Sequence, residues 1–246
     1  MTVPLVRAEQ ARAVMLELFP EGFEEHEGPD GLELAAYTNA GGEERVWQAF
    51  GGAVGDDVAE DWHDRWRRFH RPVRIGELWV GPPWETPDAG ALAVVIDPGR
   101  AFGTGGHATT RLCLELLQEL PRGSLLDIGS GSGVIAVAAA KLGFEPVLAL
   151  DSDPQAVEAT AANALANGVD VGVSLADATV EPLPEATVAV ANITLASVGQ
   201  LGARLRSRLV VTSGYLVSEQ PGLTGFRHVD RRAEDGWAAD LLARDE

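Results

Sequence analysis

Residues 125–140 read Leu-Leu-Asp-Ile-Gly-Ser-Gly-Ser-Gly-Val-Ile-Ala-Val-Ala-Ala-Ala, and this stretch decides the fold. Its apolar beginning is typical of a short buried strand, and its alanine-rich end is a strong helix former. Between them, Gly129, Gly131 and Gly133 allow a tight backbone turn. Such a turn points backbone N–H groups, at the positive end of a helix, toward a ligand above the strand end. The stretch therefore predicts a site for a nucleotide-like ligand.

The acidic residues around the turn indicate which ligand it binds. Dinucleotide sites usually have the spacing G-x-G-x-x-G and bind a pyrophosphate, whereas the spacing here is G-x-G-x-G. Asp127 precedes the first glycine by two positions, where a carboxylate repels a pyrophosphate but suits a cationic ligand such as S-adenosylmethionine. Asp151 ends the apolar run 146–150, so we expect it at the tip of the next strand, where a carboxylate can accept both ribose hydroxyls. The alternative for the whole pattern is a tight turn followed by a helix cap.

The segments that follow repeat the alternation of strand and helix. We expect a helix from Pro154 to Asn167, opened by an Asp-Pro pair and closed by Asn-Gly. Further strands are expected over residues 171–175, 187–191, 209–212 and 237–242. This alternation is typical of an α/β domain, in which ligands bind at the carboxyl edge of the sheet where the strand order reverses.

Residues 1–58 are expected to form a separate small α/β domain for substrate recognition, residues 59–90 a linker with a connecting helix, and residues 91–246 the cofactor domain. The aromatic residues Trp62, Trp66 and Phe69 form one face of the connecting helix. Residues 1–70 contain 15 acidic and 6 basic side chains, which accounts for half of the formal net charge of −18. That acidic surface is either a docking site for a basic protein or a solvated face.

The composition limits the classes of partner. A net charge of −18 argues against nucleic acid, because phosphates would be repelled. The chain has no long apolar run, and its single cysteine, Cys113, excludes an intramolecular disulfide. We therefore expect a cytoplasmic protein with no membrane contact, and favour a monomer.

A loop rich in glycine and threonine precedes the cofactor strand. Residues 101–110 read Ala-Phe-Gly-Thr-Gly-Gly-His-Ala-Thr-Thr, a composition that is unsuited to a core and indicates a loop folded over a ligand. A helix is expected to follow over residues 111–120. In the alternative interpretation, Thr109 or Thr110 only caps that helix.

This loop, the glycine turn, the string Asp-Ser-Asp-Pro at 151–154 and the string Ala-Asn-Ile at 191–193 together resemble the ribosomal large-subunit protein eleven methyltransferase family (PrmA-like). The resemblance covers the chain from about residue 60 to the end and is weaker before it. It implies a Rossmann-like class I methyltransferase fold, with a mostly parallel seven-stranded sheet and helices on both faces, plus a small N-terminal α/β domain that binds the substrate protein. It also implies transfer of methyl groups from S-adenosyl-L-methionine to lysine or N-terminal amino groups of a basic ribosomal protein.

The turn, the loop and the resemblance together define the candidate site, which includes no metal. The expected cofactor-binding residues are Phe102, Gly103, Thr104, Thr110, Asp127, Gly129, Gly131, Gly133, Asp151, Asp177 and Asn192. Asp177 either reaches the adenine amino group or lies in solvent. Asn192 is also the first catalytic candidate, because a neutral amide can orient an amine without raising its pKa. His107 is the second catalytic candidate; its alternative role is only to order its loop.

The sequence disfavours one other class of function and leaves three alternatives open. Nucleic-acid amino methyltransferases usually carry Asn-Pro-Pro-aromatic after the fourth strand, whereas residues 192–195 here read Asn-Ile-Thr-Leu. That class is therefore disfavoured. The alternatives that stay open are an N-methyltransferase for another protein or a small amine, a NAD-binding oxidoreductase, and a non-catalytic module that binds the cofactor.

Overall fold

The computed structural model describes residues 1–19, 23–29, 31–36, 38, 40–52, 70–98 and 105–245. The chain divides into two compact units, Met1–Phe69 and His70–Glu246. Residues 70–90, which the sequence analysis placed in a linker, contribute strands to the core of the larger unit. The expected helix with Trp62, Trp66 and Phe69 lies outside the described residues.

The smaller unit contains a three-stranded antiparallel sheet in the order β1-β3-β2. Its elements are β1 Thr2–Val3, a 3₁₀ turn Leu5–Arg7, α1 Ala8–Leu18, β2 Glu24–Gly28, β3 Gly31–Ala35 and α2 Ala40–Phe50. The first strand is short, because Pro4 lacks an N–H for the ladder and the chain turns into the 3₁₀ segment. The core of this unit includes Met15, Leu32 and Leu34, each almost fully buried.

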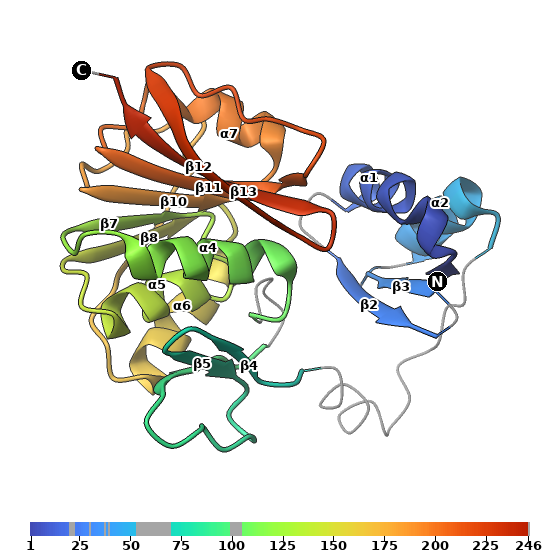
Figure 1. Ribbon diagram of the computed structural model, residues 1–246, viewed down its shortest axis with the longest axis horizontal. Helices are drawn as coiled ribbons and strands as arrows, with labels where there is room; N and C mark the ends of the chain where they lie inside the picture. Colours follow the sequence, from blue (N-terminus) through green and yellow to red (C-terminus); the bar gives the residue numbers. More distant parts are fainter. Residues whose placement is uncertain are drawn as a thin grey trace. The chain divides into compact units, whose positions relative to one another are not determined.

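The larger unit is organised around a seven-stranded sheet in the order β12-β13-β11-β10-β7-β8-β9 (Figure 1). Its strands are β7 Leu125–Ile128, β8 Val147–Asp151, β9 Gly172–Leu175, β10 Val188–Asn192, β11 Leu209–Leu216, β12 Phe226–Glu234 and β13 Trp237–Arg244. Strand β13 is antiparallel to both of its neighbours, and the strands from β11 to β9 are parallel. The sheet is therefore mostly parallel, as the resemblance implied.

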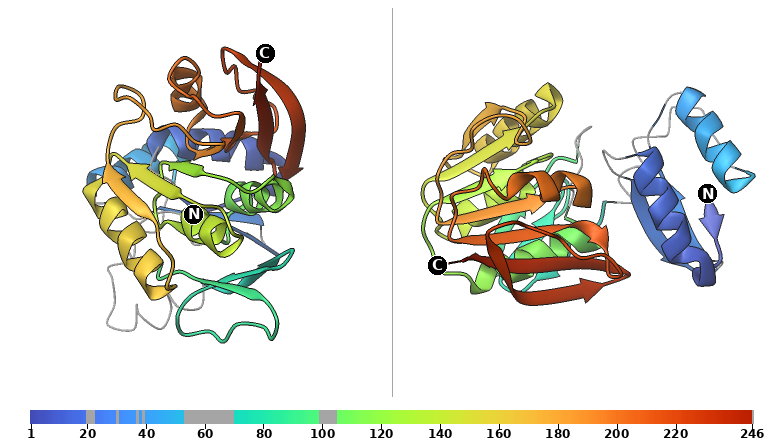
Figure 2. Two further views of the ribbon diagram at one scale, coloured as in Figure 1. Left: turned by 90° about the vertical axis from the view of Figure 1, so that its left-hand side faces the viewer. Right: turned by 90° about the horizontal axis from the view of Figure 1, so that it is seen from above.

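Helices cover both faces of this sheet (Figures 1 and 2). The helices are α4 Ala108–Glu119, α5 Val134–Lys141, α6 Pro154–Ala166 and α7 Leu195–Leu201. Helices α4, α5 and α6 contribute to one apolar cluster with Val190 and Val211 of the sheet, whereas α7 packs on the opposite face with Ala189 and Val210. Cys113 of α4 is fully buried in the first of these clusters.

A second, three-stranded sheet in the order β4-β5-β6 completes the unit. Its strands are β4 Val73–Ile75, β5 Leu78–Gly81 and β6 Leu92–Val95. The side chain of Asn167, just after α6, accepts a hydrogen bond from Val95 N at 2.9 Å and donates one to Val95 O at 2.6 Å. An amide side chain thus satisfies the backbone of β6 as a neighbouring strand would.

The topology gathers three strand ends at one place. From β7 the chain moves through β8 and β9 to one side of the sheet, and it returns with β10 to the other side of β7. The strand order therefore reverses between β7 and β10, where open parallel sheets bind ligands. The carboxyl ends of these strands bring Asp151 and Asn192 beside the glycine turn that follows Ile128.

Candidate functional site at the carboxyl ends of β7, β8 and β10

The three glycines of the turn all have positive φ angles, of 71° for Gly129, 54° for Gly131 and 81° for Gly133. Side chains are strained in this region of backbone space, so glycine is required by conformation alone. Packing adds a second reason. A Cβ on Gly129 would lie 2.4 Å from Ile193 Cγ2, and a Cβ on Gly133 would lie 2.9 Å from Thr160 Cα. The glycines therefore allow the turn to pack closely against β10 and α6.

The backbone N–H groups of this turn are used mainly within the protein. Gly129 N donates to Leu150 O at 2.9 Å, Gly133 N donates to Ser130 O at 2.7 Å, and Gly131 N donates to Asp151 Oδ2 at 2.9 Å. The expectation that the turn points free N–H groups at the ligand is therefore wrong for these three glycines. The ligand-facing chemistry has to come from side chains at the edge.

Asp151 is the clearest such side chain. It lies half-buried at the tip of β8, and besides the Gly131 N–H its other oxygen accepts the N–H of Asp153 at 3.0 Å. A carboxylate has about four acceptor positions, so about two are left for hydroxyl donors. Asp151 thus fixes the turn to β8, lies at the strand tip where the sequence placed it, and keeps free acceptor positions.

Asp127 lies deeper, on β7, with 1 % of its surface exposed. Its Oδ2 accepts the N–H of Ala136, in the first turn of α5, at 3.1 Å. Burial, with a smaller contribution from the negative charge of Asp151, raises the pKa of Asp127 to about 7, although the hydrogen bond from Ala136 acts in the opposite direction. Asp127 therefore joins β7 to the start of α5 from within the core, and a cation bound nearby would favour its ionised form.

Two residues that the sequence analysis missed support the turn from α6. Thr160 donates from Oγ1 to Gly131 O at 3.1 Å, and Asn163 donates from Nδ2 to Ser132 O at 2.9 Å. Both side chains are buried. The sequence signal was the polar set at 160, 163 and 167, which recurs at helical spacing in an otherwise alanine-rich helix.

Helix α4 approaches the same edge with its N-terminal turn. Thr110 is fully buried, and its Oγ1 accepts a hydrogen bond from Asn192 Nδ2 at 3.4 Å. The helix begins at Ala108, three residues before the expected Arg111, and the alternative in which Thr109 or Thr110 caps it is excluded. His107 is the N-cap: its Nδ1 lies 2.8 Å from Thr109 Oγ1, and its ring makes an edge contact with Trp237 at 4.8 Å between centroids. The structure thus brings Thr110 and Asn192 together.

The remaining predicted residues divide into two groups. Phe102, Gly103 and Thr104 lie outside the described residues. Asp177 is exposed after β9, where its Oδ1 accepts both the N–H and the hydroxyl of Thr179, at 2.8 and 2.6 Å. These hydrogen bonds, together with the charge of Arg204, lower the pKa of Asp177. Asp177 is therefore ionised, and one of its oxygens is already engaged in a local turn.

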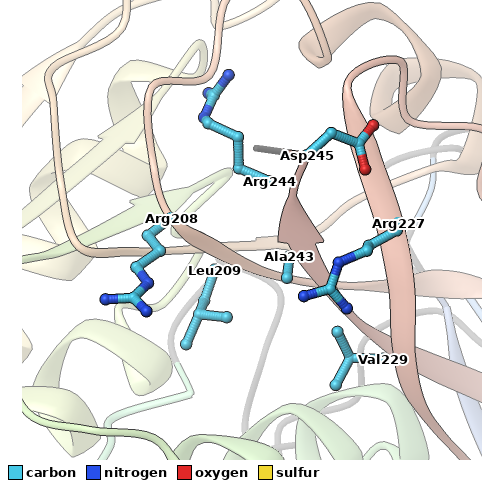
Figure 3. A pocket seen from close by; sticks show the side chains of 7 residues that line it. All are labelled: Arg208, Leu209, Arg227, Val229, Ala243, Arg244 and Asp245. Carbon is cyan, nitrogen blue, oxygen red and sulfur yellow. The ribbon is translucent and has the colours of Figure 1, made fainter.

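Other concave regions lie away from this edge. A cavity of about 450 Å³ is lined by the beginning of β11, by β12 and by the end of β13 (Figure 3). Its lining includes Leu209, the first residue of β11, four residues before Ser213, which pairs with Asn192. In the described ranges no group of three or more His, Cys, Asp or Glu side chains could hold a metal ion. Within the same ranges, no helix combines the length and apolarity of a membrane span.

Comparison with known proteins identifies the family. Residues 37–239 match the sequence model of a family described as ribosomal protein L11 methyltransferase (PrmA). The chain belongs to this family. The match includes the glycine turn, both edge carboxylates and Asn192.

Individual family members agree with this. The chain is 41 % identical over 201 residues to the ribosomal protein L11 methyltransferase of Symbiobacterium thermophilum, covering 75 % of this chain and 66 % of the relative. It is 44 % identical over 194 residues to that of Azotobacter vinelandii, covering 72 % of this chain and 66 % of the relative. The aligned part of the chain thus spans slightly less than two thirds of these curated relatives. A crystal structure of the ribosomal protein L11 methylase from Lactobacillus delbrueckii subsp. bulgaricus has a TM-score of 0.63 at 26 % identity, covering 72 % of this chain and all of that one.

Proposed function

We propose that this protein is an S-adenosylmethionine-dependent protein methyltransferase that acts on lysine or N-terminal amino groups of ribosomal protein L11 in the cytoplasm. The observation that carries the proposal is membership of the L11 methyltransferase family over residues 37–239. The geometry of the β7, β8 and β10 edge supports it independently, because that edge presents acidic and amide side chains beside a close-packed glycine turn.

The residues at the edge fit this cofactor. S-adenosylmethionine carries a cationic sulfonium, an ammonium group and two ribose hydroxyls. The negative charge of Asp151 raises the pKa of the buried Asp127, and a cation nearby would relieve that repulsion. Asp151 retains acceptor positions for the hydroxyls. When bound, the cofactor supplies an electrophilic methyl group.

The acceptor amine has to lose its proton before it attacks. An ordinary lysine has a pKa near 10.4, so the neutral form at pH 7 costs about 5 kcal/mol. Burial and a neighbouring cation both lower that pKa, whereas an additional carboxylate beside the amine would raise it. We propose that Asn192 lies at this point because a neutral amide can accept an N–H of the amine without this penalty. Its Nδ2 already donates to Thr110, which leaves the amide oxygen as the acceptor.

The smaller unit is proposed as the region that recognises the substrate protein. Residues 1–70 account for half of the net charge of the chain, at 15 acidic against 6 basic side chains. Ribosomal proteins are mostly basic, so attraction between opposite charges would speed their encounter with this unit.

The proposal is tested by incubating the protein with methyl-tritiated S-adenosylmethionine and purified L11, with a second basic ribosomal protein as the specificity control. Label in L11 alone, located on lysine or N-terminal amines by mass spectrometry, is the expected result. Label in small amines only would remove the ribosomal assignment. Binding of the cofactor with no transfer to any protein would favour a non-catalytic module, and binding of NADH without binding of S-adenosylhomocysteine would favour an oxidoreductase.

A further inference from the structure

Charged side chains on facing sides of helix α4 and strand β12 join the two elements. Arg111, Glu115 and Glu119 recur every four residues on one face of α4, and Asp230, Arg232 and Glu234 alternate along β12. Two arginines make the ion pairs between them: Arg111 of α4 and Arg232 of β12. They differ in what else they contact.

Arg111 contacts three separate acceptors. Its Nε donates to Glu234 Oε2 at 2.8 Å, one terminal nitrogen donates to Asp235 Oδ2 at 2.7 Å, and the other donates to the carbonyl of Gly106. Glu234 and Asp235 form the start of the tight turn between β12 and β13, in which Asp235 has a φ of 52° and Gly236 a φ of 82°. The planar guanidinium presents its donors in a fixed fork, so one cation ties this turn to the residues before α4.

The residues that Arg111 contacts adjoin the candidate site. Gly106 is next to His107, whose ring contacts Trp237 at the other end of the same turn, and Arg111 itself follows Thr110, which bonds to Asn192. We propose that Arg111 is a positioning residue for the cofactor site, which holds residues 105–107 and the first turn of α4 in their binding geometry. This inference rests on the proposed function, because that function assigns the cofactor to this edge.

Arg232 provides a matched control within the same interface. It pairs with Glu119 at 2.6 Å and with Glu115 and Asp230 at 3.7 Å, and its side chain is 24 % exposed, against 22 % for Arg111. It joins the same helix to the same strand but has no contact with residues 105–107 among its described ion pairs. Removal of either arginine takes away ion pairs whose carboxylates are between 40 % and 65 % exposed, so each loss has a small effect on stability. A difference between the two variants in ligand binding then reports on positioning.

The test compares the dissociation constant of S-adenosylhomocysteine, measured by calorimetry, for the wild-type protein, Arg111→Ala and Arg232→Ala. We expect Arg111→Ala to weaken binding about tenfold, which is the scale of the cost of ordering a loop and its side chains on binding, and Arg232→Ala to leave it within about twofold. The double variant Glu234→Gln with Asp235→Asn should reproduce the loss, because it removes both carboxylates that pair with Arg111. Asparagine tolerates the positive φ at 235, so the turn itself is kept. Equal affinities for Arg111→Ala and Arg232→Ala would overturn the inference.

Amide hydrogen exchange of residues 105–110 in the absence of ligand gives a second readout. Arg111→Ala should speed exchange in this segment, whereas Arg232→Ala should leave it at the wild-type rate. Unchanged exchange in Arg111→Ala would also overturn the inference. If the wild-type protein does not bind S-adenosylhomocysteine at all, the proposed function fails, and the exchange comparison still decides whether Arg111 orders the segment.

Discussion

The hydroxyl of Tyr215 donates a 2.7 Å hydrogen bond to the carboxylate of Asp240, which has no exposed surface. Two β-bulges flank Asp240, one between Ser213 and Tyr215 on β11 and one between His228 and Asp230 on β12. Because each bulge adds a residue, side chains three apart in sequence point to one face of the sheet. The polar side chains gathered on the Asp240 face are Thr212, Tyr215, His228 and Arg231.

Asp240→Ala should destabilise the larger unit by about 3 kcal/mol, because it leaves Tyr215 and Arg231 without their buried acceptor. Tyr215→Phe should cost only about 1 kcal/mol, since it removes one hydrogen bond and leaves the carboxylate with His228. Urea unfolding followed by tryptophan fluorescence, to which the buried Trp237 contributes, measures both. A loss below 1 kcal/mol for Asp240→Ala would show that the network contributes little to stability.

Asp127→Asn should change the pH dependence of stability. The pKa of Asp127 is raised from 3.8 to about 7 in the folded protein, so between those values the folded state binds more protons than the unfolded chain. Rising pH in this window therefore favours unfolding, and above about pH 7 the effect is complete. The variant keeps an acceptor for Ala136 N–H but has no charge to bury. We expect its stability relative to the wild type to increase by about 2 to 3 kcal/mol from pH 5 to pH 8, and a difference that is constant with pH would contradict the raised pKa.

Gly133→Ala should be far more disruptive than Gly143→Ala. Both glycines have positive φ angles, of 81° and 89°, so alanine pays a conformational cost of about 1 to 2 kcal/mol at each. At 133 the new Cβ would also meet Thr160 Cα at 2.9 Å, whereas at 143 nothing lies within 4 Å. We expect a total loss of about 3 kcal/mol for Gly133→Ala in thermal or urea unfolding. Equal losses for the two variants would mean that the turn does not pack closely on α6.

Substitutions at Asn192 separate orientation from charge. Asn192→Ala should lower kcat by about ten- to a hundredfold, with an unchanged pH profile, because the amine loses an orienting acceptor. Asn192→Asp should be slow at pH 7 and recover at higher pH, because a carboxylate beside the amine raises its pKa. The exposed Gln200→Ala is the control and should retain wild-type rates. Matching pH profiles for the two Asn192 variants would contradict the proposed role.

The sequence predicted those helices and strands that have a clear hydrophobic pattern. The strand before the turn, the following helix and the strand that delivers Asp151 lie where expected, because buried apolar runs and alanine-rich helices have clear periods. Strand β12 was missed because it is an edge strand rich in charged residues and has no apolar alternation. The Asp-Gly pair at 235–236, a strong hairpin signal, could have revealed it.

The site was predicted in part, for a similar reason. Asp151 and Asn192 follow buried strands, so their place at the carboxyl edge could be inferred from the chain. The internal hydrogen bonds of the turn could not, since the pairing of Gly131 N with Asp151 Oδ2 depends on how β7 and β8 align. Arg111 also gave no signal, because its two carboxylate partners lie more than 120 residues later in the chain.

The central claim is that the edge formed by the glycine turn, Asp151 and Asn192 binds the methyl donor. A crystal structure of the protein with S-adenosylhomocysteine tests it most directly. We expect the ligand at this edge, with its ribose hydroxyls on Asp151. Ligand density elsewhere, such as in the cavity beside Leu209, or a ligand at the edge that makes no contact with Asp151, would contradict it.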